Sequence, residues 1–273
     1  MVFSFRNLKI LQQLRTWSLL ILPAPPVSYP LSSLKSLMTG RQCSLSLGAV
    51  HPDEVEETIS NLSNSTSYGL DQIDTSTIKL IKLDILPALT HIINLSITSR
   101  EFPGYWKRAK VIPLHKKDDL LNPKNYRPVA ILPIFSKVVE RVIFNQIIKY
   151  LSENKLLHPN HHAYRASHNT TTALIQMYDV WLKSLEAGEL AGVCFLDMSA
   201  VFDIVNHSLL LKKLELYGFD SNVVLWISSY LADRTQCVNI DGCLSPLLPV
   251  RQGVPQGSIL GPLLYTLFTN ELH

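Results

Sequence analysis

The spacing of apolar residues along the chain predicts seven helices in the sequence after residue 51. Apolar side chains recur three and four positions apart, which places them on one face of a helix. The predicted helices cover residues 52–62, 73–98, 135–151, 170–187, 208–217, 223–231 and 259–272. The second is predicted as one helix, or as two that break near Pro87. Leu174, Met177, Trp181 and Leu185 follow helical spacing in 170–187, so we expect most of them in the core.

Short segments with apolar runs or alternating polarity predict strands. These segments are 110–114, 190–196, 235–240 and 247–251. The third alternates polar and apolar residues, as a strand with one buried face does. Asp241-Gly242 follows it and is a two-residue hairpin signal, so the fourth segment is expected to pair back.

The composition is that of a globular chain. Hydrophobic residues make up 47% of the 273 residues and charged residues 17%, which suits one large domain or two small ones with a sizeable core. Residues 1–50 are rich in proline and serine and are predicted as a leader without a specified fold. Their apolar run at 17–22 is too short to span a bilayer, and we expect no membrane partner. Residues 51–105 are predicted as a helical lead-in to a main domain at 106–273.

Charge and cysteine content set further bounds. The net charge of +3 is compatible with a nucleic-acid partner without requiring one. The four cysteines form no Cys-x-x-Cys pair, and no group of cysteines and histidines has zinc-finger spacing. This pattern argues against zinc. It favours a reducing compartment inside the cell, in the nucleus or the cytoplasm.

Basic residues concentrate in the stretch 106–127. The cations are Lys107, Arg108, Lys110, Lys116, Lys117, Lys124 and Arg127, against only Asp118 and Asp119. Cations around a strand and a loop suit contacts to phosphate groups. The commoner meaning of such a run is a solvated basic edge strand, and the residues alone leave both interpretations open.

Asp197 stands where the predicted strand 190–196 ends, and Asp203 follows six residues later. A carboxylate at the end of a buried strand needs a partner, such as a divalent cation, a basic side chain or backbone amides. The simpler alternative is that Asp197 caps the turn or helix that follows. On this stretch alone the cap is the better interpretation.

A set of motifs along the chain reverses that preference. The motifs are Gly69-Leu-Asp-Gln-Ile73, Phe102-Pro103, Trp106-Lys107, Asn125-Tyr-Arg-Pro128, Tyr164-Arg165, Phe195-Leu-Asp-Met-Ser-Ala-Val-Phe-Asp203 and Gly253-Val-Pro-Gln-Gly-Ser-Ile-Leu-Gly-Pro262. With these motifs in this order, the chain from about residue 52 onward resembles the reverse transcriptase domain of LINE-type (non-LTR) retrotransposons. The last two motifs are the most diagnostic.

The resemblance implies an α+β right-hand polymerase, with helix-rich fingers, a partial palm on a small antiparallel sheet, and no thumb within the chain. Asp197 matches the first catalytic aspartate, and Met198 would add a backbone carbonyl to the same Mg²⁺ site. Phe202 matches an aromatic residue under the nucleotide sugar, where its ring would exclude a ribose 2′-hydroxyl. The residues alone leave open that Phe202 is an ordinary core phenylalanine.

The resemblance also implies contacts to substrates, which are an RNA template, a DNA primer and a deoxynucleoside triphosphate (dNTP). Gln256 and Gly257 match the loop that packs on the incoming nucleotide and the template base; without the resemblance they would form a plain turn. Arg127 and Lys116 are implied as contacts to phosphates. The further implied contacts to nucleic acid are Lys107, Arg108, Lys110, Lys117, Lys124 and Arg165.

The sequence also departs from the family pattern. It reads His-Ala-Tyr-Arg at 162–165 where the family has Phe-Gly-Phe-Arg, and Val-Asn-His at 205–207 where the family often has Val-Asp-His. The family's Ala-Asp-Asp motif does not occur between the Gln-Gly motif and His273. We therefore expect a fragment of an RNA-directed DNA polymerase that does not polymerise alone. The alternatives are a non-catalytic nucleic-acid-binding remnant and a fragment that does not fold stably.

Overall fold

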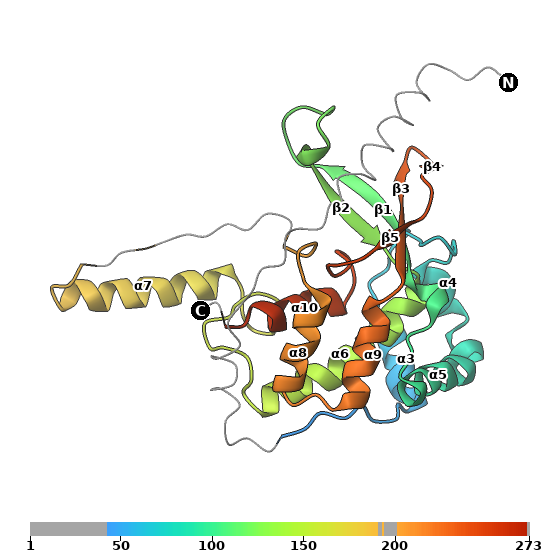
Figure 1. Ribbon diagram of the computed structural model, residues 1–273, viewed down its shortest axis with the longest axis horizontal. Helices are drawn as coiled ribbons and strands as arrows, with labels where there is room; N and C mark the ends of the chain where they lie inside the picture. Colours follow the sequence, from blue (N-terminus) through green and yellow to red (C-terminus); the bar gives the residue numbers. More distant parts are fainter. Residues whose placement is uncertain (1–42, 191–192, 194–200, 272–273) are drawn as a thin grey trace.

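The computed structural model describes residues 43–190, 193 and 201–271 as a body of helices with a small sheet at one side (Figure 1). The helices are α3 (Pro52–Ser60), α4 (Thr75–Leu80), α5 (Lys82–Ser99), α6 (Ile134–Glu153), α7 (Thr170–Glu186), α8 (His207–Leu216), α9 (Ser221–Leu231) and α10 (Leu260–Thr269), with 3₁₀ turns η1 (Gly104–Lys107) and η2 (Pro123–Asn125). The strands are β1 (Arg108–His115), β2 (Tyr126–Ile131), β3 (Arg234–Ile240), β4 (Cys243–Leu244) and β5 (Leu248–Val250). This confirms the helix-rich α+β class. The predicted strand 190–196 lies almost entirely outside the described residues.

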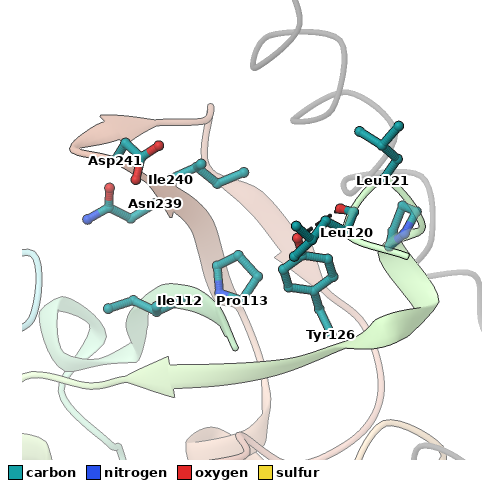
Figure 2. Close-up of a pocket in the computed structure, with 9 residues that line it drawn as sticks. Ile112, Pro113, Leu120, Leu121, Tyr126, Asn239, Ile240 and Asp241 are labelled. Atoms are coloured by element: carbon teal, nitrogen blue, oxygen red, sulfur yellow. Dashed lines mark hydrogen bonds between the residues drawn. The ribbon is translucent and has the colours of Figure 1, made fainter. Parts of the chain in front are cut away.

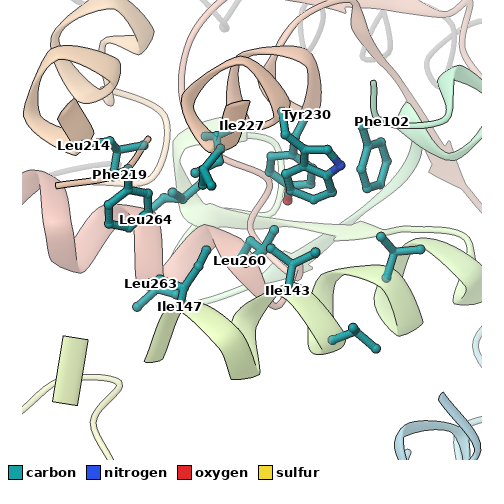
Figure 3. Packing of buried hydrophobic residues seen from close by; sticks show 14 of the residues in the cluster. Phe102, Ile143, Ile147, Leu214, Phe219, Ile227, Tyr230, Leu260, Leu263 and Leu264 are labelled. Atoms are coloured by element: carbon teal, nitrogen blue, oxygen red, sulfur yellow. The ribbon is translucent and has the colours of Figure 1, made fainter. Parts of the chain in front are cut away.

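Helix α6 lies at the centre of the helical body. It packs against α3 on one side and α10 on another, while α10 packs on α8 and α8 on α9. Figure 3 shows Ile143 and Ile147 of α6 facing Leu260 and Leu263 of α10, and all four side chains are buried. Each such burial stabilises the fold by about 1.5–3 kcal/mol. The position of α10 is therefore set by tight packing on α6.

Local signals explain where the helices begin. Pro52 occupies the first turn of α3, and His51 and Glu54 form a capping box around its start. Of the two alternatives for 73–98, the structure has two helices, but they meet at Ile81 and not near Pro87. Pro87 lies inside α5. It cannot donate a hydrogen bond to the carbonyl of Leu83, whose exposed position leaves that carbonyl within reach of water.

The sheet has the order β2-β1-β3-β4, with β5 also paired to β3. Its β1–β2, β3–β4 and β3–β5 pairs are antiparallel, but β1 and β3 pair in parallel, with Arg108 opposite Thr235. The sheet is therefore mixed and not antiparallel throughout. The long helical connection between β1 and β3 makes a parallel pairing possible. The hairpin turn at Asp241-Gly242 is confirmed, with both residues at positive φ.

Helix α7 does not join the core. Figure 1 shows it projecting from the helical body, and none of its side chains is buried. Leu174 is 62% exposed and Leu185 65% exposed, while Met177 and Trp181 are half-buried. The expectation that this apolar face lies in the core is thus wrong for the described residues. Periodicity predicts an amphipathic helix, but it does not specify a packing partner.

Residues 43–50 are not a loose leader. Leu45 and Val50 belong to the main core, and Leu45 exchanges backbone hydrogen bonds with Gly218 and Asp220. The same core contains Phe102 of the predicted lead-in and Leu264 of the predicted main domain. The prediction of an unspecified leader is corrected for residues 43–50, and residues 1–42 lie outside the described part of the chain.

Candidate nucleotide and nucleic-acid site

The loop 253–258, which we call the Gln-Gly loop, is hydrogen-bonded to residues 202–205, at the end of the Asp197 motif. Gly253 N donates to the Val205 carbonyl at 2.9 Å, and Val254 N donates to the Phe202 carbonyl at 2.7 Å. Gly253 has φ 81°, and a Cβ there would lie 2.7 Å from the Phe202 carbonyl oxygen. Glycine is thus required for both the conformation and the close approach.

The other end of the Gln-Gly loop is fastened to β2. Ala130 N donates to the Gln256 carbonyl at 2.8 Å. Gly257 has φ 129°, and a Cβ there would lie only 2.3 Å from the Ala130 carbonyl oxygen. The loop therefore bridges β2 and residues 202–205, two parts of the chain that are far apart in sequence.

A buried carboxylate fixes the start of α10, directly after this loop. Glu140 of α6 is fully buried and accepts hydrogen bonds from Ile259 N at 2.8 Å and Leu260 N at 3.1 Å. Ser136 Oγ donates to its other oxygen at 2.8 Å. A negative charge at a helix N-terminus also complements the helix dipole. Sequence reasoning missed Glu140, although a lone carboxylate on the face that carries Ile143 was a usable signal.

Phe202 lies between two other aromatic rings. Its ring centroid is 6.1 Å from that of Tyr164, at an interplanar angle of 68°, and 5.3 Å from that of Tyr265 on α10, at 51°. Phe202 itself is half-buried, and Tyr164 is 54% exposed. The aromatic residue next to the Gln-Gly loop therefore has neighbours on two sides that restrict its ring.

His207 and Asp203 are two titratable groups at this junction. His207 Nε2 lies 2.7 Å from the Gly253 carbonyl oxygen, so we assign the proton to Nε2. Burial lowers the pKa of His207, and the charge of Arg234 acts in the same direction. Asp203 is exposed as a residue, yet the protein atoms packed around its carboxyl group raise its pKa. The imidazole therefore holds the Gln-Gly loop in its neutral form.

Two cations predicted to contact nucleic acid are buried. Lys107 and Lys110 are each 7% exposed. Burial lowers the pKa of Lys107, and the Lys110 ammonium lies 4.1 Å from the ring centroid of Tyr68. Their ammonium groups are packed against protein, so we remove both from the proposed phosphate contacts.

Other predicted cations are exposed around the β1–β2 hairpin. Arg108, Lys116, Lys117 and Arg127 are all exposed. Lys116 N donates to the Asn125 carbonyl at 2.8 Å, which closes the loop between the two strands. Arg127 lies three residues before Ala130, or about 10 Å along β2 from the contact with the Gln-Gly loop. Arg127 and Lys116 therefore lie at the loop end of the strand that the Gln-Gly loop touches.

Arg165 and Lys124 are the two remaining predicted contacts to nucleic acid. Arg165 is half-buried, and its Nη1 donates to the His158 carbonyl at 3.2 Å. The side chain of Lys124 lies outside the described part of the structure. Arg165 thus supports its own loop in this structure and does not project freely into solvent.

A cavity of about 310 Å³ lies between the loop after β1 and the β3–β4 hairpin (Figure 2). It is lined by Ile112, Pro113, Leu120, Leu121, Pro123, Tyr126, Asn239, Ile240 and Asp241. None of the described candidate residues lines it. The cavity is therefore separate from the junction at the Gln-Gly loop.

The predicted metal ligands Asp197 and Met198 lie outside the described residues. Within residues 43–190, 193 and 201–271, no three His, Cys, Asp or Glu side chains gather as a metal site. In the same ranges, no helix combines the length and apolarity needed to cross a bilayer. The predicted metal site therefore stays a prediction.

Comparison with known proteins identifies relatives of this chain, and the matching family covers the Gln-Gly loop and β2. Residues 114–273 match the family described as "Reverse transcriptase (RNA-dependent DNA polymerase)". The chain is 34% identical over 232 residues to the RNA-directed DNA polymerase from mobile element jockey of Drosophila melanogaster, which covers 85% of this chain and 25% of the relative. It is 32% identical over 241 residues to the probable RNA-directed DNA polymerase from transposon BS of the same species, covering 88% and 26%.

A more distant relative is the retrovirus-related Pol polyprotein from the type-1 retrotransposable element R2 of Popillia japonica. It is 27% identical over 201 residues, covering 73% of this chain and 27% of the relative. The chain thus spans about a quarter of the length of these relatives. On the family match and these identities, the chain belongs to the reverse transcriptase family, within the RNA-directed DNA polymerases of non-LTR retrotransposons.

Proposed function

We propose that this chain is the part of an RNA-directed DNA polymerase that binds the incoming dNTP and the paired template. The observation that carries the proposal is the double attachment of the Gln-Gly loop, through the N–H groups of Gly253 and Val254 to residues 202–205 and through the Gln256 carbonyl to β2. A loop held at both ends fixes the backbone at Gln256, from which the side-chain amide would reach the base pair. A fixed starting point for that amide favours recognition of a base pair.

Each remaining candidate residue has a role at this junction. Phe202 would lie under the sugar of the dNTP and exclude a ribose 2′-hydroxyl. Arg127 and Lys116 would contact phosphates of the nucleotide or template, because fixed cations offset negative charge there. These roles are compatible with the half-buried ring of Phe202 and the exposed cations on the β1–β2 hairpin.

We propose Asp197 and the Met198 carbonyl as ligands of Mg²⁺, a cation that prefers hard oxygen ligands and keeps part of its shell for substrate phosphates. When bound, the metal would activate the primer hydroxyl and stabilise the leaving pyrophosphate. Within this sequence no Asp-Asp pair follows Asp197. We therefore propose that the 273-residue chain binds substrates but does not extend a primer. Template-dependent extension that is abolished by Asp197→Asn would contradict that part of the proposal.

Binding of an RNA template–DNA primer duplex to the purified chain tests the proposal. The double variant Arg127→Ala/Lys116→Ala should bind the duplex more weakly. It should also lower the slope of log affinity against log salt concentration by about one for each lost phosphate contact. Arg141→Ala, which removes an exposed arginine of α6, is the matched control. It should change neither the affinity for the duplex nor its salt dependence. Equal losses in the two cases would contradict the proposed site. RNA binding without any binding of dNTP would instead indicate a nucleic-acid-binding remnant.

A further inference from the structure

The environment of Phe202 suggests a role for a residue that the proposed function does not use. Tyr164 presents its ring edge-on to Phe202, and Tyr265 of α10 contacts Phe202 as well. Tyr164 is 54% exposed, whereas Tyr265 is half-buried. The greater exposure of Tyr164 places it on the solvent side of the three rings. A nucleotide sugar that reaches Phe202 from solvent would therefore arrive beside Tyr164.

The loop that carries Tyr164 is held on the end of α10. Arg165 Nη1 donates to the His158 carbonyl, and His158 N donates to Asn270 Oδ1 at 2.8 Å. Asn270 is 2% exposed and also donates to the Leu156 carbonyl at 3.0 Å. Tyr265 belongs to α10, and the loop of Tyr164 is hydrogen-bonded to Asn270 at the end of α10. The positions of both rings that contact Phe202 therefore depend on α10.

The backbone at Tyr164 is also unusual. Its φ is 53°, in the left-handed region that a bulky residue rarely adopts and that costs about 1 kcal/mol or more. Such a conformation persists only where the surroundings hold it. Core burial does not explain it, because more than half of the side chain remains exposed. Tyr164 makes its contact with Phe202 from this conformation.

We propose that Tyr164 is a positioning residue, which holds the Phe202 ring at the angle that excludes a 2′-hydroxyl. Tyr164 then sets how strictly the site prefers a dNTP over a ribonucleotide, without contacting the reacting atoms. The inference rests on the proposed function, because it assigns Phe202 to the nucleotide sugar. It predicts that the ring of Tyr164 matters and that its hydroxyl does not.

The test compares the affinities for dGTP and GTP of the full 273-residue chain, bound to an RNA template–DNA primer duplex in MgCl₂ and measured by equilibrium dialysis. Phe202→Ala is the reference for loss of the preference. Tyr164→Ala should reduce the preference for dGTP about two- to tenfold, the range that corresponds to one aromatic pair. Tyr164→Phe should keep the wild-type preference. Tyr178→Ala removes a tyrosine of α7 with 60% exposure and should change nothing.

A second readout does not depend on nucleotide binding. In the ¹³C-phenylalanine NMR spectrum of the chain, Tyr164→Ala should shift and sharpen the ring signals of Phe202, because the ring loses a neighbour and turns faster. Tyr164→Phe should leave these signals close to wild type. Unchanged Phe202 signals in Tyr164→Ala would overturn the inference, whatever the nucleotide data show.

The outcomes separate the two proposals. If Phe202→Ala loses the preference and Tyr164→Ala keeps it, the inference is wrong and the proposed function stands. If Tyr164→Phe loses as much preference as Tyr164→Ala, the hydroxyl contacts the nucleotide and the positioning role is wrong. If the wild-type chain shows no preference, the assignment of Phe202 is wrong, and the inference falls with it.

Discussion

Helix α10 is buried along nearly its whole length, whereas α7 lies in solvent. Eight of the ten residues of α10 are buried, and none of the 17 residues of α7 is. Helix α7 is tied to its surroundings mainly at its first turns, where His162 hydrogen-bonds Thr172 at 3.1 Å and Gln176 at 2.7 Å. The two helices show that length and an apolar face do not decide whether a helix is buried in the core.

The ends of α10 explain much of the difference. Glu140 accepts hydrogen bonds at its N-terminus, and the Lys213 ammonium donates to the Phe268 carbonyl at 2.6 Å near its C-terminus. Lys213 also forms an ion pair with Glu271. Each charge opposes the partial charge of the helix end that it meets. The Gln-Gly loop lies directly before α10, so the proposed site adjoins a helix that is held by side chains at both ends.

Glu140→Ala should produce the largest effect and make α10 resemble α7. Two backbone N–H groups would lose their acceptor in a buried place, at about 1–3 kcal/mol each, so we expect unfolding to become easier by about 3–5 kcal/mol. Urea unfolding followed by circular dichroism measures this. Glu140→Gln keeps one acceptor oxygen and should lose less. Glu186→Ala, at an exposed glutamate of α7, is the control and should cause no measurable change. Equal stability of Glu140→Ala and wild type would contradict the anchoring role.

Gly257→Ala should have the next largest effect, because two costs combine there. The substitution puts a side chain at φ 129° and a Cβ 2.3 Å from the Ala130 carbonyl oxygen, so β2 and the Gln-Gly loop must separate. We expect a loss of about 2–4 kcal/mol and weaker dNTP binding. Gly188 follows α7 and has φ 72° but open space around it. Gly188→Ala should therefore cost only about 1 kcal/mol. Equal losses at the two glycines would show that crowding at β2 is unimportant.

The helices and the loop motif could be predicted because each depends on nearby residues. Apolar spacing predicts α6 and α9, and Asp241-Gly242 predicts a hairpin turn, because these signals act within a few positions. The capping role of Glu140 could not be predicted, because its partner Ile259 N lies 119 residues away. The burial of Lys110, whose ammonium contacts the ring of Tyr68, also depends on a residue far away in the sequence. For α7, periodicity predicts a helix but contains no information about its partner.

His207 should make the unfolding free energy fall at acid pH. This effect should be smaller than the losses expected for Glu140→Ala and Gly257→Ala. Burial lowers the pKa of His207 in the folded chain below the ordinary value of 6.5. The unfolded chain therefore binds a proton more readily, so the stabilisation is complete above about pH 6.5 and is lost as the pH falls towards the folded pKa. Unfolding free energies measured from pH 7.5 downwards should show this slope. His207→Gln can still donate to Gly253 and should flatten the slope, whereas His91→Gln, at an exposed histidine of α5, should leave it unchanged.

Substitutions on the exposed face of α7 should have the smallest effects. Leu174→Ala and Leu185→Ala remove side chains that are 62% and 65% exposed, so each should change the unfolding free energy by less than about 0.5 kcal/mol. Leu264→Ala in α10 removes a fully buried side chain of the same type, and its loss should be about 2–5 kcal/mol. Chemical denaturation of the three variants gives the comparison directly. A large loss at Leu174 or Leu185 would show that α7 is packed in solution, and that the contrast with α10 is smaller than the structure indicates.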